Sequence, residues 1–292
     1  MNITGIFAYD VKKHNLIMKF ICSLLVIATT FGSLYSQNAS SGSQFYEVMR
    51  NLPIGEREDL IVKEITSGNI PEFLKKFVPV KTVQRDSTGR KHKVTFFVTA
   101  DYLAVGNNLD YFTIPMGPIS AQKIADSMGT SLPTPKVVDI IYEKSKLKLE
   151  PFNYIPRGNR NETPDILNDH SRVIQAQIKA SGNMPGIFVA GTKKDIVISS
   201  KLSDPKRTHH VTIYGWHRLN GVAIQPPTNV HIDIYVDYSH GVRLISNRVI
   251  VDGKEYDYRK LLSDPLLHTL LSGEKEPLLR TSYLVENPSE KR

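Results

Sequence analysis

Groups that can transfer protons gather in one short stretch of the C-terminal third, IYVDYSHGVRLI, residues 234–245. His240 stands three residues after Asp237, and a histidine beside a carboxylate is a workable general base because the carboxylate orients the ring and raises its pKa. Ser239 is a candidate nucleophile if a histidine reaches its hydroxyl. With His217, which lies upstream, these residues form the predicted catalytic group: His217, Asp237, Ser239 and His240.

The residues from 230 to 239 alternate between apolar and polar types, which predicts a β-strand. Val230, Ile232, Ile234, Val236 and Tyr238 would form the apolar face of this strand, with His231, Asp233, Tyr235, Asp237 and Ser239 opposite. His231 and Asp233 are therefore predicted to support the catalytic group. The alternative is that the polar row is the solvated face of an antiparallel sheet.

Four residues are candidates for binding substrate: Arg243, Lys193, Lys194 and Trp216. Arg243 would hold a substrate carboxylate, and the two lysines would attract an anionic group, although charges of this kind are also common in a hairpin turn. Trp216, the only tryptophan, suits ligand stacking or core packing. Asp101 and Asp195 are predicted to support the site, since a buried carboxylate must be paired or protonated.

A divalent metal remains an alternative. Three nitrogen or oxygen ligands and an open position are what catalytic zinc requires, and the sequence offers His217, His231, Asp233, Asp237 and His240. Their spacing matches no metal-binding signature. The cofactor is therefore left unknown. His209 and His210 are interpreted as structural or exposed.

The elements that must position these residues indicate an α+β fold, because predicted strands and helices are segregated more than they alternate. We expect a β-rich C-terminal half with short helices packed on one side, and a helical N-terminal cap. The predicted divisions are a signal peptide (1–37), a linker and helical cap (38–80), a single α+β domain (81–280) and a C-terminal tail (281–292). The chain of 292 residues, 40% hydrophobic, can bury a sizeable core.

Individual elements follow from local patterns. Residues 81–85 and 93–106, joined by the turn-rich residues 86–92, predict a β-hairpin, and residues 248–258 predict another with Asp252 and Gly253 in its turn. Two helices are expected within residues 119–149, the first capped by Ser120 and the second by Thr134 followed by Pro135. A further helix is expected over residues 169–182. Residues 150–168, rich in Pro, Asn and Gly, predict a surface loop.

The N-terminus has the layout of a secretory signal peptide: Lys19, an apolar run from Phe20 to Ala28, and small or polar residues up to Gln37. An uncleaved anchor is the alternative. The only cysteine, Cys22, lies in this segment, so the mature chain would contain no disulfide and no thiolate nucleophile. We predict a secreted or periplasmic protein with no membrane span after signal removal.

The formal charge of +8 favours an anionic envelope polymer or peptide as partner. Lysines and arginines are spread along the chain, without a basic block or a nucleic-acid-binding motif, so the sequence gives no strong nucleic-acid signal.

Five blocks, VTADYLAVG, SLPTPKVVD, AGTKKD, IYGWH and VDYSHGVRL, resemble those of a family of uncharacterised secreted bacterial proteins, over about residues 94–272. This resemblance implies no stated activity. A weaker resemblance is to the L,D-transpeptidases, whose nucleophile lies in a Ser/Thr-His-Gly-Cys segment followed by a basic residue. Ser239, His240, Gly241 and Arg243 match, but Val242 stands where the cysteine should be. Cysteine chemistry is therefore excluded.

These observations lead to two functional hypotheses. The first is an envelope enzyme, a hydrolase or transferase acting on a cell-wall or extracellular polymer through a His/Asp/Arg cluster. The second is a non-catalytic extracytoplasmic protein that recognises a ligand or another protein through the same polar surface. A purely structural role for the histidines is the third reading.

Overall fold

The computed structural model describes residues 40–155 and 158–285. The predicted signal peptide, Cys22 and most of the predicted C-terminal tail lie outside these residues. Among the helices described, none combines the length and the apolar character needed to cross a membrane.

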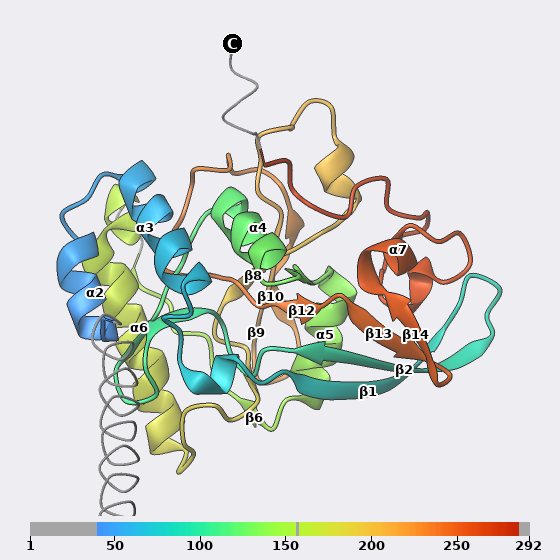
Figure 1. Ribbon diagram of the computed structural model, residues 1–292, viewed down its shortest axis with the longest axis horizontal. Coiled ribbons are helices and arrows are strands. Elements are labelled where there is room, and N and C mark those ends of the chain that lie inside the picture. Colours follow the sequence, from blue (N-terminus) through green and yellow to red (C-terminus); the bar gives the residue numbers. More distant parts are fainter. Residues whose placement is uncertain (1–39, 156–157, 286–292) are drawn as a thin grey trace, which may run out of the picture. The chain divides into compact units, whose positions relative to one another are not determined.

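The largest sheet has six strands and is antiparallel throughout (Figure 1). Its order is β14-β13-β2-β12-β5, and β1 also pairs with β2. The strands are β1 (Val78–Arg85), β2 (Lys91–Val98), β5 (Thr130–Ser131), β12 (Ile245–Ser246), β13 (Arg248–Val251) and β14 (Lys254–Asp257). Both predicted hairpins, β1–β2 and β13–β14, are confirmed. The second strand of the first hairpin ends at Val98 and not at Gly106 as predicted, because residues 104–106 form a separate strand that pairs with residues 111–113.

A second sheet of four strands carries most of the predicted site. Its order is β10-β9-β8-β11, with β9 antiparallel to both neighbours and β11 parallel to β8. Its strands are β8 (Lys194–Ile196), β9 (Ile213–His217), β10 (Ala223–Thr228) and β11 (His240–Gly241). Two small pairs complete the strands: β3 (Ala104–Gly106) with β4 (Tyr111–Thr113), and β6 (Leu147–Lys148) with β7 (Val189–Ala190).

The helices are α2 (Gly42–Met49), α3 (Ile54–Thr66), α4 (Pro118–Ser127), α5 (Pro135–Lys144), α6 (Pro164–Ala180) and α7 (Tyr258–Leu262). Four short 3-10 helices join them: η1 (Glu72–Leu74), η2 (Gly158–Glu162), η3 (Ser200–Ser203) and η4 (His268–Leu270). α2 packs against β3, β4 and α6, whereas α5 packs against β9. Helices and strands are segregated along most of the chain, so the predicted α+β class is confirmed.

Of the two predicted helix caps, one is confirmed and the other is wrong. Thr134 caps α5 as predicted, since its hydroxyl oxygen accepts the Val137 N–H at 3.2 Å. The prediction that Ser120 caps the preceding helix is wrong, because α4 begins at Pro118 with Gly117 as its cap residue. The Glu58 carboxylate of α3 accepts the Gly117 N–H instead, at 3.0 and 3.1 Å.

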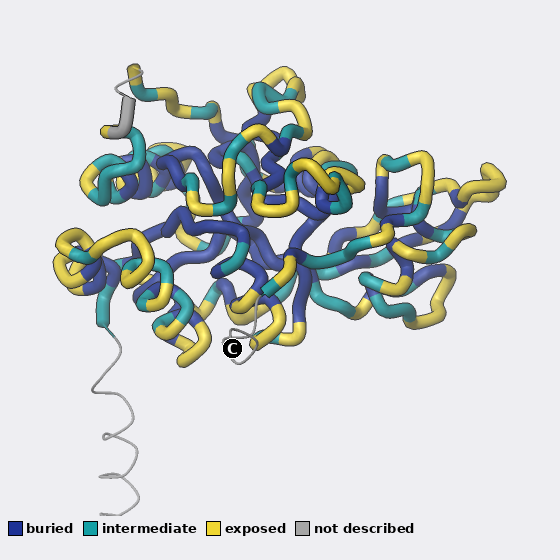
Figure 2. The backbone as a smooth tube through the Cα atoms, turned by 90° about the horizontal axis from the view of Figure 1, so that it is seen from above, coloured by how far each residue is buried: buried dark blue, intermediate teal, exposed yellow. Residues whose placement is uncertain are grey.

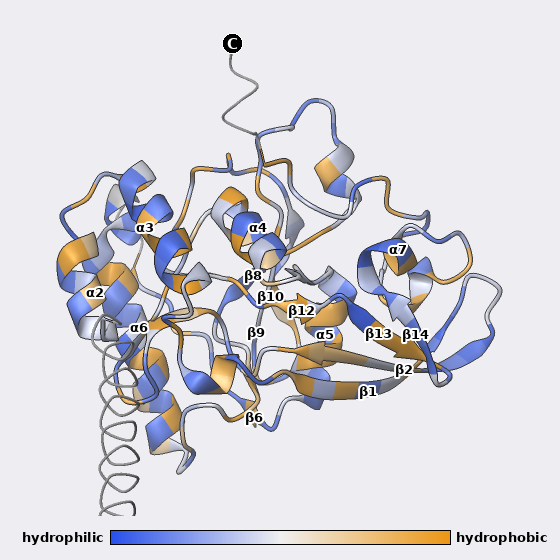
Figure 3. Cartoon of the chain, viewed as in Figure 1, coloured by the Kyte–Doolittle hydropathy of each residue, from blue (hydrophilic) through white to orange (hydrophobic). Residues whose placement is uncertain are grey.

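The core fills the space between the sheets and the helices, where the backbone is buried in Figure 2. β2 shows how the sequence produces this burial. His92, Val94, Phe96 and Val98 point inward, and the residues between them are half-buried or exposed. Figure 3 shows the hydrophobic character of β2. A smaller apolar cluster lies beside α6: Leu149, Ile174, Ile178 and Val189.

The predicted strand over residues 230–239 is wrong. Residues 231–239 form turns and a single isolated bridge, between Ile232 and His210, and regular pairing begins only at His240. Val230, Ile232 and Ile234, expected to face the core, are 57%, 49% and 64% exposed. The cause is local hydrogen bonding. The carboxylate of Asp237 accepts the N–H of Ser239, which closes a turn in place of a ladder bond.

Candidate functional site

Asp237 organises the turn that precedes β11. One carboxylate oxygen accepts both the backbone N–H, at 2.8 Å, and the hydroxyl of Ser239, and the other accepts the Tyr235 hydroxyl at 3.1 Å. Burial alone would raise the pKa of Asp237. The neighbouring His240, Lys194 and the Ser239 hydrogen bonds outweigh burial and hold the pKa at about 2. Asp237 is therefore ionised at neutral pH.

Ser239 does not occupy the position of an activated nucleophile. Its hydroxyl donates to Asp237, and its residue is 1% exposed. No described histidine accepts a hydrogen bond from this hydroxyl, because both His240 ring nitrogens are unpartnered and the hydrogen bonds of His92, His217 and His268 go to other groups. The catalytic role predicted for Ser239 thus lacks the required geometry. Its contribution is to fix the turn.

His240 is the most unusual group of the cluster. The residue is fully buried, and neither ring nitrogen has a hydrogen-bond partner within the described residues. Its ring meets that of Tyr235 edge to face, with centroids 5.7 Å apart. Burial lowers the pKa of His240 to about 4, against the opposing effect of Asp237. The imidazole is therefore neutral at pH 7.

Gly241 is required directly beside this histidine. A Cβ at residue 241 would lie 2.6 Å from the Tyr102 ring and 2.7 Å from Lys193 Cβ. Contacts this short do not occur between real side chains, so the backbone of β11 can approach Lys193 and Tyr102 only as glycine. The position of His240 depends on that close approach.

Lys194 pairs with His240 in the register of β8 and β11, and Lys193 lies against Gly241, but the two lysines have different surroundings. Lys193 is fully buried and donates to the Tyr238 carbonyl oxygen at 2.6 Å. Burial lowers its pKa to about 7, although Asp237 and Asp101 favour the charged form. Lys194 is half-buried, and its ammonium lies 5.0 Å from the Trp216 ring centroid. Lys194 is thus the accessible cation of the pair.

Trp216 is held in a conformation that is uncommon for a bulky residue. Its φ is +59°, its side chain is 5% exposed, and its indole N–H has no partner among the described residues. The backbone N–H of Trp216 donates to the Lys193 carbonyl oxygen. Its ring packs in the main core, 6.2 Å from that of Tyr238.

Asp195 and Arg243 belong to an interior network rather than to an open site. Asp195 accepts the Tyr102 hydroxyl at 2.8 Å, and burial raises its pKa to about 6, against the opposing effect of Arg243. The Arg243 guanidinium donates to the carbonyl oxygens of Thr99 and Val189, each at 2.7 Å, and lies 4.5 Å above the Tyr102 ring.

Arg243 is only 1% exposed. The sequence analysis assigned it to a substrate carboxylate, and the geometry does not fit that role, because its donors are committed to backbone acceptors inside the protein. It connects β11 to the end of β2 and to β7. Asp101, equally buried, accepts the Tyr102 N–H at 2.7 Å, and burial raises its pKa in spite of Arg243 nearby. Arg243 and Asp101 thus bond to backbone groups in the interior of the protein.

His217 lies apart from His240. Gly215 of β9 and His240 of β11 both pair with Lys194, so β9 and β11 flank β8 on opposite sides, about 10 Å apart. The His217 ring stacks on Tyr142 at 4.6 Å, and its Nε2 lies 3.0 Å from Asp139 Oδ1. The predicted pairing of His217 with Asp237 is therefore not formed. The sequence analysis did not identify Asp139 as the partner of His217. The only sequence feature that points to it is its place between apolar residues of α5.

His231 and Asp233 also separate. The His231 ring stacks on Tyr235 with centroids 4.1 Å apart, at the half-buried rim of the Asp237–His240 cluster. Asp233 instead forms an ion pair with the exposed His209 at 3.5 Å and lines a different hollow. Tyr235 stacks on His231 and donates its hydroxyl hydrogen bond to Asp237. The sequence analysis placed Tyr235 on the polar face of a strand and gave it no role in the site.

The five candidate metal ligands are consequently dispersed over three places. Within the described ranges, no three His, Cys, Asp or Glu side chains are grouped closely enough to hold a metal ion.

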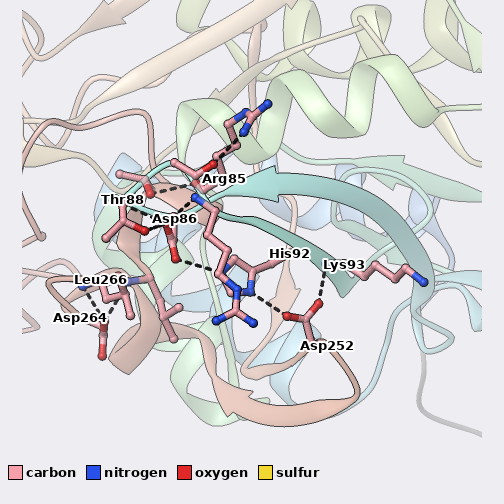
Figure 4. A network of polar contacts seen from close by, with 12 residues as sticks. Arg85, Asp86, Thr88, His92, Lys93, Asp252, Asp264 and Leu266 are labelled. Carbon is pink, nitrogen blue, oxygen red and sulfur yellow. Dashed lines mark hydrogen bonds and ion pairs between the residues drawn. The ribbon is translucent and has the colours of Figure 1, made fainter.

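A second histidine cluster, which the sequence analysis missed, lies at the end of the large sheet (Figure 4). His92 Nε2 lies 3.0 Å from Asp86 in the β1–β2 turn, and its Nδ1 lies 2.7 Å from Asp252 in the β13–β14 turn. Asp86 and Asp252 raise the pKa of His92. The hydroxyl of Thr88 and then His92 lower the pKa of Asp86. We call this group the Asp86–His92–Asp252 clamp.

Comparison with known proteins adds no assignment: no family model, no curated protein and no solved structure matches this chain. The candidate site is therefore defined by its geometry alone. It consists of an ionised carboxylate, a neutral buried imidazole and a buried amine of lowered pKa, with a cation and two stacked rings at the half-buried rim: Asp237, His240, Lys193, Lys194, His231 and Tyr235. Trp216 packs in the core beneath Lys194, so the ligand-stacking role predicted for it does not fit.

Proposed function

We propose that this protein is a hydrolase or transferase of the cell envelope that acts on a cell-wall or extracellular polymer, with His240 as its general base or acid. The observation that carries the proposal is a buried, neutral imidazole with two unpartnered ring nitrogens beside an ionised carboxylate. Buried polar groups are normally hydrogen-bonded, and exceptions concentrate at catalytic positions.

In this proposal Asp237 stabilises the imidazolium that forms when His240 takes a proton from the attacking group. Lys193, whose pKa is lowered to about 7 by burial, is the second proton carrier. Lys194 binds the polymer at the rim, where it attracts an anionic group. The set differs from that predicted by the sequence, since His217 and Ser239 take no part in proton transfer and the buried Arg243 and Trp216 do not bind substrate.

The envelope location rests on the N-terminal pattern of Lys19 followed by the apolar run 20–28. It is tested separately by fractionating cells that express the full chain and determining the N-terminus of the recovered protein by mass spectrometry. Cleavage close to Gln37 supports export. An intact N-terminus in a cytoplasmic fraction contradicts it.

The activity test uses isolated peptidoglycan sacculi, with soluble and newly linked fragments identified by liquid chromatography and mass spectrometry. We expect His240→Gln to lower product formation by about 100-fold or more, the range of a lost general acid–base group. His209→Gln is the matched control, because His209 is exposed and lies outside the cluster. Co-sedimentation with sacculi measures binding in parallel.

A second candidate function, recognition without turnover, is favoured by the rim. The half-buried Lys194 offers a cation, and the stacked, half-buried His231–Tyr235 pair offers an aromatic surface, which together suit a glycan or peptide without any chemistry. Lys194→Ala separates the two. If wild-type protein yields no product and Lys194→Ala releases it from sacculi, recognition is supported. If neither product nor binding is found with sacculi, this polymer is not the target.

A further inference from the structure

A hollow of about 640 Å³ lies in another part of the molecule and includes none of the residues of the His240 cluster. Five segments distant in sequence form its walls: the start of α3, the start of α4, residues 208–210, residues 233–236 and residues 283–284. A volume of this size accommodates a small organic molecule or the side chains of a peptide.

One wall of the hollow is apolar and open to solvent. Ile54, Ile234 and Leu284 are 40%, 64% and 65% exposed, and Ile119, Val236 and Tyr283 continue the wall. Exposed apolar residues scattered singly over a surface are ordinary, whereas several that face one concavity mark a binding site. Ile234 and Val236 stand here because the 231–239 segment turns instead of forming a strand.

The lining also carries three carboxylates, Glu58, Asp59 and Asp233, with one lysine, Lys123, and two histidines, His209 and His210. Asp233 is paired with His209. Among the described residues, neither Glu58 nor Asp59 forms an ion pair. Burial raises the pKa of Glu58 even though Ser120 and Gly117 donate hydrogen bonds to it. A nearby positive charge would stabilise this carboxylate.

Capping of α4 explains why Glu58 points toward Gly117, and it also fixes the carboxylate in the wall. It does not account for the exposed apolar wall, nor for Asp59 beside it. The exposed apolar residues and the carboxylates together suit a ligand with one apolar end and one cationic end.

We propose that this hollow binds a ligand in which an apolar body is joined to a cationic amino group. The body lies against Ile54, Ile234 and Leu284, and the ammonium group lies at Glu58 and Asp59. A small amphiphilic amine with a linear hydrocarbon chain has this chemistry. The inference is independent of the activity proposed for the His240 cluster.

The test uses three probes of nearly equal size, octylamine, octanol and octanoate, in isothermal titration calorimetry with the full chain. We expect octylamine to bind at least about tenfold more tightly than octanol, and octanoate to bind most weakly. Equal affinities for all three, or no binding of octylamine, would overturn the proposal.

Glu58→Gln keeps an oxygen that can accept the Gly117 N–H while removing the charge. We expect it to reduce the affinity for octylamine by about tenfold and to leave octanol unchanged. Glu56→Gln is the matched control on the same helix, because Glu56 is exposed and does not line the hollow. Unequal effects of these two variants support the site, and equal effects contradict it.

Asp59→Asn provides a second charge variant in case Glu58→Gln weakens the start of α4, since Asp59 is exposed and does not cap that helix. Ile234→Ser tests the apolar wall and should weaken all three probes together. If Asp59→Asn and Ile234→Ser both leave octylamine affinity unchanged in folded protein, the ligand does not bind in this hollow.

Discussion

Two buried histidines of this protein are surrounded in opposite ways. Both ring nitrogens of His92 face carboxylates, and the residue joins the turns of two hairpins. Neither ring nitrogen of His240 has a partner within the described part of the chain, although Asp237 lies close by. The pKa of His92 is raised and that of His240 is lowered to about 4. The comparison distinguishes a histidine whose two ring nitrogens join distant turns from one whose ring nitrogens bond to no described residue.

The largest expected effect concerns the packing that places His240. Gly241→Ala should destabilise the protein by about 3 kcal/mol, because the new methyl group collides with Tyr102 and Lys193. Gly55→Ala, in α3 with open space around it, should be neutral or stabilise by about 0.5 kcal/mol. Urea denaturation of both variants measures the difference. Similar stabilities would show that β11 is loosely packed.

The same substitution at the two histidines should have unequal effects. His92→Leu leaves two carboxylates without their partner and should lower the melting temperature by several degrees. His240→Leu removes no hydrogen bond to a described residue and exchanges an unpartnered polar ring for an apolar side chain, so the melting temperature should stay constant or rise. Differential scanning calorimetry at pH 6 compares them. Equal losses would invalidate the distinction.

The two sites should also give stability profiles of opposite slope with pH. The pKa of His92 is raised above 6.5, so its contribution is complete below pH 6.5 and is lost as the pH rises through the folded value. Asp86 and Asp252, with pKa values lowered below 3.8, contribute above pH 3.8 and lose this contribution as the pH falls. The clamp is therefore strongest between about pH 3.8 and 6.5.

For His240 the sign is reversed. Because its pKa is lowered from 6.5 to about 4, the unfolded chain takes up a proton in that range that the folded protein does not, and stability falls as the pH decreases. Free energies of unfolding from pH 4 to 9 test both statements. His240→Leu should flatten the acidic limb, and His92→Leu the limb above pH 6.5. Unchanged limbs would mean that these residues do not titrate as described.

The smallest effect is expected at Ser239. Ser239→Ala removes one hydroxyl bond to Asp237 while the backbone N–H bond remains, and should cost about 1 kcal/mol. Any activity on sacculi should persist, because the hydroxyl is not placed against a histidine. Complete loss of turnover in a variant of nearly wild-type stability would restore Ser239 as the nucleophile.

Local patterns in the sequence were sufficient for the hairpins and for α5. The turn at Asp252 and Gly253 has positive φ at both residues, as an Asp-Gly hairpin requires, and Thr134 caps the helix that Pro135 begins. These features depend on neighbouring residues only. The segment 230–239 shows the limit, since its perfect alternation was overridden by the Asp237 carboxylate, which binds the backbone two residues later.

The site could be predicted only in part, because its geometry depends on distant residues. Asp237 and His240 are neighbours in sequence and in space, and the register of β11 adds Lys193 and Lys194. The burial of Arg243 and its hydrogen bonds could not be predicted from the neighbouring sequence, because its acceptors are the carbonyl oxygens of the distant residues Thr99 and Val189. The Asp86–His92–Asp252 clamp joins His92 to Asp252, 160 positions later, and no local sequence pattern predicts such a contact.

The position of β2 has a consequence for how the chain assembles. It pairs with β1 immediately before it, but its other edge is covered by β12 and β13, about 150 residues later. Long-range pairing of this kind slows folding, because the loop must close before the contacts form. A chain that ends before Ile245 would leave Val94 to Val98 as an open apolar edge, and such edges invite intermolecular β-pairing and aggregation.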